Sequence, residues 1–284
     1  MSRQTPRIPR FYIDYGQYLV AQGLEGLSDN QIKALQLNPT ELKNIGSLNI
    51  ELPDVLVDNT LTNYIAILGH VENPYGFGYS NPKVNLDGLP GWSLYVSEEP
   101  NAKGEINFNY GNPIGALSVG HYFDMPHAPD ISLSISKEYD GVKQVKTKGG
   151  ATLSNATYTS VPRWGDLPAW QIGEDGYSRT GRRVWSLNFS FLSPSAIMGE
   201  NEMSSPYKEN VEAGFDTTLI DNNDFFSRVI NGTLGGHLPF IFQPDNSVFQ
   251  PDQFAICRFD MNSFNMTQTS PNLYSMSLKI RESW

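Results

Sequence analysis

The most site-like group of residues in this chain is His121-x-x-Asp124-x-x-His127, because two imidazoles and a carboxylate can together hold zinc or iron. On an extended strand, however, positions 121 and 127 would lie about 20 Å apart. The three groups can meet only if Pro126 turns the chain back. We expect turn formation and hydrogen bonding at a domain boundary here, and we assign no metal ligand.

Other oxygen-rich or nucleophilic groups have simpler interpretations. The run Asp221 to Asp224 is rich in oxygen ligands but lacks the glycine and the later glutamate of a calcium-binding EF-hand, so it indicates helix capping. Glu98 and Glu99 are adjacent on a strand and point to opposite faces, which argues against a glycosidase pair. Cys257, the single cysteine, lies in an apolar strand and is interpreted as a small buried hydrophobe. With no nucleophile elbow and no Walker loop, we predict no enzyme, no catalytic residue and no cofactor.

Composition limits the classes of protein that the chain can belong to. Aromatic residues make up 12% of the 284 residues, and 25 glycines and 19 prolines suit many short strands with frequent turns. A formal net charge of −10 argues against non-specific binding of nucleic acid. A single cysteine allows no intrachain disulfide, the basic N-terminus lacks the apolar core of a signal peptide, and no run of eighteen apolar residues predicts a membrane span.

The last hundred residues contain the clearest elements. Residues 182–191 alternate polar and apolar side chains, which predicts a half-buried strand with Trp185, Leu187, Phe189 and Phe191 on one face. A helix is expected over 221–232, with Asp221 or Asn222 as cap, Asp224 in the first turn, and an apolar stripe of Phe225, Phe226, Val229 and Ile230. Strands are expected around 238–246, 254–259 and 274–281.

The first part of the chain contains further short strands. A strand is expected at 11–15, followed by a short helix in which Ser28 and Gln31 form a capping box. Turn-separated strands are then expected at 48–52, 63–70, 92–96, 106–110, 117–123, 131–136 and 151–159. Tyr139 to Val142 is interpreted as a hairpin turn. This spacing is typical of a β-sandwich.

The C-terminal pattern resembles a known family. A strand with Arg183-x-Trp185-x-Leu187-x-Phe189, a helix, the run Pro239-Phe240-Ile241-Phe242-x-Pro244-Asp245, and a last strand ending in Leu278-Lys279-Ile280-Arg281 are similar to the ring-forming domain of bacteriophage distal tail proteins. The resemblance covers about 181–284 and is looser over 126–170. Separately, the run Ala66 to His70 resembles galactose-binding-like jelly-roll modules, which implies a sandwich over about 40–125.

From these observations we expect an all-β dominated fold with a β-sandwich or barrel ring domain, one packed helix and an inserted jelly-roll-like β-sandwich. Residues 1–40 would supply an arm, the first strand and a short helix that join the ring domain. Residues 41–125 would form the insert, and residues 126–284 the ring-forming tail domain.

Two groups of candidate contact residues follow from this organisation. Aromatic side chains in or beside turns can stack on sugars or fill pockets of a partner protein; these are Tyr75, Phe77, Tyr79, Trp92, Trp164 and Trp170. The N-terminal arm and the polar loop 197–218 are candidate ring contacts, with Arg3, Arg7, Arg10 and the terminal Trp284 as the residues of interest.

The resemblance implies a structural virion protein at the tail tip. It would form a symmetric homo-oligomer, a hexamer by analogy, that connects the tail tube protein to baseplate hub or fibre proteins while DNA passes through as cargo. The first alternative is a carbohydrate-binding tail or decoration protein that recognises host glycans. Another tail component, such as a tube, terminator or baseplate protein, is the second alternative, and a polysaccharide-degrading enzyme on a β-scaffold is the third.

Overall fold

The computed structural model describes residues 7–16, 20, 26–37, 43–51, 63–68, 84–85, 92–96, 105–110, 113–138, 142–156, 163–164, 167–168, 182–198, 224–248 and 253–283. Strands predominate in these ranges and the helices are few and short, which confirms the predicted β-dominated fold. Among these residues, no helix combines the length and apolar character needed to cross a membrane.

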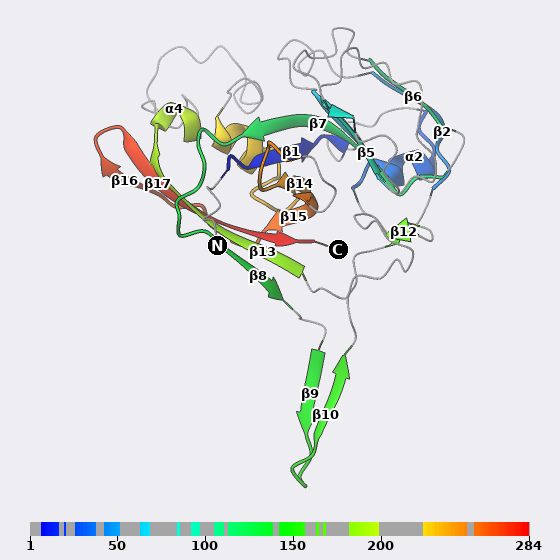
Figure 1. Cartoon of the computed structure of the whole chain (residues 1–284). Helices are drawn as coiled ribbons and strands as arrows, with labels where there is room; N and C mark the ends of the chain where they lie inside the picture. The colour runs from blue at the N-terminus through cyan, green and yellow to red at the C-terminus, as the bar shows by residue number, and fades with distance from the viewer. Residues whose placement is uncertain are drawn as a thin grey trace.

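Most of the described strands belong to one large antiparallel sheet (Figure 1). The strands are β1 (Arg10–Asp14), β2 (Gly46–Glu51), β3 (Tyr64–Leu68), β4 (Val84–Asn85), β5 (Trp92–Val96), β6 (Glu105–Tyr110), β7 (Ala116–Asp124), β8 (Ser134–Glu138), β9 (Val142–Lys146), β10 (Thr152–Ala156), β11 (Arg163–Trp164), β12 (Leu167–Pro168), β13 (Arg182–Leu192), β14 (Phe240–Gln243), β15 (Ala255–Phe259), β16 (Met266–Ser270) and β17 (Leu273–Glu282). The order across the sheet is β4-β5-β3-β7-β1-β14-β15-β17-β13-β8, with β16 added on β17. Three further strand pairs, β2 with β6, β9 with β10 and β11 with β12, lie outside it.

Strand β1 joins the two parts of the chain. It pairs with β7 on one side and with β14 on the other, so Phe11 lies between Phe123 and Phe242. Strands β3 and β5, from the expected insert 41–125, extend the same sheet beyond β7. Strands β3, β4 and β5 of that insert are therefore joined, through β7, to the first strand of the chain, whereas β2 and β6 form a separate pair.

Both faces of β1 are buried, because the alternating side chains of a strand point to opposite sides. Phe11 and Ile13 face the main hydrophobic core, where Phe11 packs edge-on against Phe225 with ring centroids 5.6 Å apart. Tyr12 faces the other side and meets Tyr64 at 5.0 Å between ring centroids. The predicted first strand is thus a central element of the fold, and it begins at Arg10, within the expected arm.

The expected helix over 221–232 is present in part and differs in kind. The structure has a π-helix, η1 (Phe226–Asn231), and the side chain of Asp224 accepts hydrogen bonds from the backbone N–H of Ser227 at 2.9 Å and from its hydroxyl at 2.8 Å. Asp224 therefore binds the first turn of this helix, whereas Asp221 and Asn222, the expected caps, lie outside the described residues. Phe225 and Val229 are buried in the core as the apolar stripe predicted.

The capping box at the short helix α2 (Asp29–Ala34) is confirmed. The backbone N–H of Ser28 donates to Oε1 of Gln31 at 2.8 Å, and the Gln31 N–H donates to the Ser28 hydroxyl at 3.4 Å. The Gln31 amide nitrogen also donates to the carbonyls of Ile45 and Ser47. One side chain therefore both closes the helix start and attaches the helix to strand β2.

Strand β13 follows the predicted alternation up to Ser190 and then departs from it. Trp185, Leu187 and Phe189 are buried, but Phe191 is 72% exposed. The register with β17 shifts between Phe189 and Leu192, and Phe191 has a φ of 63°. The prediction that Phe191 faces the core is wrong, because a β-bulge turns its side chain outward. A four-residue helix, α4 (Pro194–Ile197), follows this strand.

Candidate interaction surface

Arg10, one of the expected ring contacts, is engaged within the chain. Its Nε and Nη2 donate to the two carboxylate oxygens of Asp124, each at 2.7 Å, and its guanidinium lies 4.0 Å from the centroid of the Tyr122 ring. Burial lowers and the hydrogen bonds to Asp124 raise the pKa of Arg10, with a net rise. This two-pronged pair fixes the end of β1 against the end of β7, whereas Arg7 is exposed.

The remaining expected contact residues are described in part or not at all. Trp92 lies in β5 and Trp164 in β11, where the backbone alone is described. In the loop 197–218, Ile197 is buried and Met198 packs against the core. The following residues lie outside the described ranges: Arg3, Tyr75, Phe77, Tyr79, Trp170 and Trp284.

The three residues of the His-Asp-His motif are not brought together. His121 is buried and its Nδ1 shares a hydrogen bond with the Tyr15 hydroxyl, Asp124 binds Arg10, and Nδ1 of His127 lies 2.7 Å from the carbonyl of Ala128. Among the described residues, no group of three or more His, Cys, Asp or Glu side chains could hold a metal ion. Each member of the motif thus has its own structural partner.

His121 belongs to a buried polar cluster at the contact between β7 and η1. Burial, together with the nearby positive charge of Arg228, lowers the pKa of His121 to about 3. The side chain of Arg228 also hydrogen-bonds to Tyr15, whose pKa is raised by burial. A neutral imidazole held between a tyrosine and an arginine keeps the helix attached to the sheet without burying a second cation.

Asp14 is a further buried ionisable group, and its side chain lies on the other face of β1. Its Oδ1 accepts hydrogen bonds from the Ser118 hydroxyl at 2.9 Å and from the Val119 N–H at 3.1 Å. Burial outweighs these hydrogen bonds and raises the pKa of Asp14 to about 7. Since both groups are buried and bound to neighbouring strands, we interpret them as supports of the fold.

Strand β8 is the last strand at one end of the large sheet. Among the described strands, β8 pairs with β13 alone, and the chain leading to it is fixed by the Asp130 N–H, which donates to the Asn188 carbonyl at 2.7 Å. Ile135 of β8 lies opposite the buried Trp185, so it shares the face that covers the core, yet it is 59% exposed. Ile131, just before the strand, is 84% exposed. The apolar face of the sheet therefore continues past the part that the chain itself covers.

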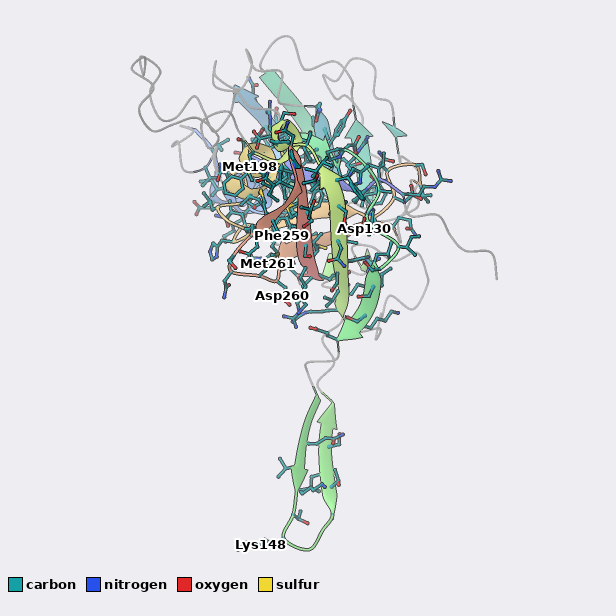
Figure 2. The ribbon with its side chains drawn as sticks, turned by 90° about the vertical axis from the view of Figure 1, so that its left-hand side faces the viewer. Asp130, Lys148, Met198, Phe259, Asp260 and Met261 are labelled. Carbon is teal, nitrogen blue, oxygen red and sulfur yellow. The ribbon has the colours of Figure 1, made fainter. Side chains whose placement is uncertain are left out.

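Beyond β8 the chain forms the hairpin β9–β10, which projects away from the rest of the molecule in both views (Figures 1 and 2). Val145 and Leu153 lie directly opposite each other in its register and are 62% and 61% exposed. These two residues were missed by the sequence reasoning, which placed the hairpin turn at 139–142, where Val142 begins β9 and residues 139–141 lie outside the described ranges. The Gly149-Gly150 pair between two alternating runs was the signal that could have found the turn.

We call β8, the preceding residues 130–133 and the hairpin β9–β10 the edge-and-hairpin surface. Its exposed isoleucine, valine and leucine side chains are suited to contact with another protein, because apolar atoms gain by leaving water. A comparison of the chain with protein-family models, with curated proteins and with solved structures finds no match in any of the three.

Proposed function

We propose that this chain is a structural protein that assembles with copies of itself into a ring at the distal end of a bacteriophage tail. In that position it joins the tail tube protein to baseplate hub or fibre proteins and leaves a lumen through which DNA passes. The tail location comes from the resemblance of residues 181–284 to the ring-forming domain of distal tail proteins. The self-assembling role is supported by the described residues.

The observation that carries the assembling role is the edge at β8, which pairs with β13 alone among the described strands. An unpaired strand edge is a template for pairing with another chain, and soluble proteins usually protect it with charge, bulges or a covering segment. Here the described edge strand has four exposed residues in succession, of which Ile135 is apolar and Lys137 is charged, and Ile131 just before the strand is also exposed. Such an edge is expected in a protein whose neighbour covers it after assembly.

A ring places a further demand on the contact. Each copy must use one surface to bind a different surface of its neighbour, because head-to-tail contacts close into rings whereas self-complementary contacts give pairs. The edge-and-hairpin surface lies at one end of the sheet order, and β4 lies at the other. The two ends are different in sequence and length, so the molecule has the asymmetry that a head-to-tail contact requires.

Electron microscopy of the purified protein tests this proposal. We expect particles with a central lumen and a single rotational symmetry, six-fold by the resemblance. Exchange of Ile135 for lysine should reduce the fraction of closed particles, since it places a charge in the covered edge. Images that contain single molecules alone, at every protein concentration, would contradict the proposal.

A further inference from the structure

The hairpin β9–β10 differs from the rest of the chain in its charge. Residues 142–156 contain three lysines and no acidic residue. Without these three, 17 of the chain's 20 basic residues remain against 30 acidic ones, so the rest of the chain has a net charge of −13. The hairpin is therefore basic whereas the rest of the sequence is acidic, and Lys148 marks the tip of the hairpin (Figure 2).

The hairpin has a well-defined turn. The Thr147 N–H donates to the Ala151 carbonyl at 2.9 Å, the Gly150 N–H donates to the Thr147 carbonyl at 3.0 Å, and the Ala151 N–H donates to the Thr147 hydroxyl at 3.1 Å. Gly150 has a φ of 84°, which glycine adopts without the steric cost that other residues incur. These contacts define a three-residue loop that ends in a left-handed glycine, one of the common ways to close a hairpin.

The hairpin's exposed apolar pair needs a covering partner. A two-stranded hairpin is marginally stable in water by itself and is stabilised when a third strand or another surface covers it. Val145 and Leu153 lie opposite each other on one face, with 62% and 61% of their surface exposed. The apolar pair supplies contact area, and the lysines of the same segment supply a preference for an acidic partner.

We propose that the hairpin β9–β10 docks on the acidic body of a second copy of this chain. Val145 and Leu153 form the apolar part of the contact, and Lys148 at the tip of the hairpin forms the electrostatic part. This inference deepens the proposed ring and rests on it for the closed symmetry, but the docking step can be tested by itself. Because the hairpin binds a surface different from itself, the contact can repeat head-to-tail, as a ring requires, whereas reciprocal docking of two copies gives a pair.

The charge distribution favours a second copy over nucleic acid as the partner. DNA would bind the lysines of the hairpin, but it would also approach a body with a net charge of −13. An apolar pair gains nothing from a phosphate backbone, whereas it gains from burial against a protein surface. A second copy of this chain can bury the apolar pair and also attract the positive charge of the hairpin.

Sedimentation velocity of the full chain, over a concentration series in about 0.05 M and about 0.5 M salt, tests the docking. The wild type should associate more weakly in the higher salt. Exchange of Val145 and Leu153 together for serine should raise the dissociation constant at least tenfold. Lys148→Glu should raise it at least threefold in low salt and have less effect in high salt, since screening weakens the exposed ion pairs.

Two matched variants control for non-specific effects. Lys33→Glu makes the same change of charge at an exposed site on the body and should leave association unchanged or tighter, because it makes the body more acidic. Leu234→Asn removes a comparable apolar side chain, 68% exposed, at another turn and should leave association unchanged. Both Val145 and Leu153 are exposed, so their exchange is not expected to unfold the body.

The outcomes separate the docking from the ring. If the wild type forms closed rings and both hairpin variants form them equally well, the docking is overturned and the ring stands. If the wild type associates through the hairpin into open chains or pairs, the docking stands and the ring is overturned. A wild type that stays monomeric overturns both, and a monomer that binds a DNA duplex through Lys148 identifies nucleic acid as the partner instead.

Discussion

Asp14 and His121 lie on the paired strands β1 and β7 but on opposite faces of the sheet. His121 is directly opposite Ile13, whose neighbour Asp14 points the other way. Burial acts on the two groups in opposite directions, raising the pKa of the Asp14 carboxyl to about 7 and lowering the pKa of the His121 imidazole to about 3. Both side chains are therefore neutral in the folded protein between about pH 3 and about pH 7.

This relationship predicts two pH dependences of opposite sign. Between about pH 4 and 7 folded Asp14 keeps a proton that the unfolded chain has lost, so its contribution to stability falls as pH rises. Between about pH 3 and 6.5 the unfolded chain binds a proton that folded His121 does not, so that contribution rises with pH. The two slopes, each about 1.4 kcal/mol per pH unit, should cancel between about pH 4 and 6.5.

Asp14→Asn should reveal the pH dependence that His121 alone contributes to the free energy of unfolding. Because asparagine can still accept from Ser118 and Val119, the free energy of unfolding should rise with pH by about 1.4 kcal/mol per unit more than in the wild type, between about pH 4 and 6.5. His121→Gln should give the opposite slope in the same window. Urea unfolding at a series of pH values measures both, and a pH profile of Asp14→Asn that runs parallel to the wild type would rule out the neutral carboxyl.

Gly120→Ala should disrupt the pairing of β1 with β7. A Cβ at Gly120 would lie 1.9 Å from the carbonyl oxygen of Ile13, a backbone atom that cannot move away without breaking the sheet. We expect a loss of about 1–3 kcal/mol or more in the free energy of unfolding, measured by urea denaturation. Gly149→Ala is the control, since the nearest atom to its added Cβ is 4.0 Å away; equal stability of the two variants would contradict the close approach of β1 and β7.

Phe191→Asn should not weaken the single chain, although Phe191 continues an apolar strand. A left-handed conformation costs a residue with a Cβ roughly 1–2 kcal/mol, and asparagine tolerates it better than phenylalanine. Thermal unfolding at low protein concentration should show an equal or higher midpoint than the wild type. Leu234→Asn, at a second exposed site with a φ of 52°, should behave in the same way. A large drop for Phe191→Asn would mean that the side chain packs inward after all.

A double-mutant cycle between Arg10 and Asp124 separates a structural role from a contact role. If the two-pronged pair stabilises the single chain, Arg10→Gln and Asp124→Asn should show a coupling energy of about 0.5–3 kcal/mol in unfolding experiments. Arg10→Lys should recover part of the stability, since it keeps the charge but not the paired geometry. Independent, additive effects of the two exchanges would mean that the pair does not stabilise the single chain, and would favour a contact role for Arg10.

The sequence was most informative where one local pattern decides the structure. Alternation predicted β13 as far as Phe189, and the Ser28 and Gln31 pair predicted the start of α2. The departure at Phe191 was not predictable, because a bulge depends on the register with β17 and not on the strand's own residues. The π-helix η1 is likewise not encoded in the spacing of its apolar residues, which suits an α-helix equally well.

Long-range pairing and exposure were the least predictable features. The extension of the sheet from β1 through β7 to β3 depends on contacts between residues about 50 to 110 positions apart. Val145 and Leu153 have the same types and alternation as buried strand residues, so their sequence suggests a core position. They become candidates for contact only when the hairpin is seen to extend from the body.

The mass of the purified protein in solution, measured by light scattering across a concentration series, tests the central claim most directly. A structural ring protein should give a closed oligomer, near six protomers, whose mass stops rising once the ring is complete. A mass of one protomer at every concentration would contradict the claim.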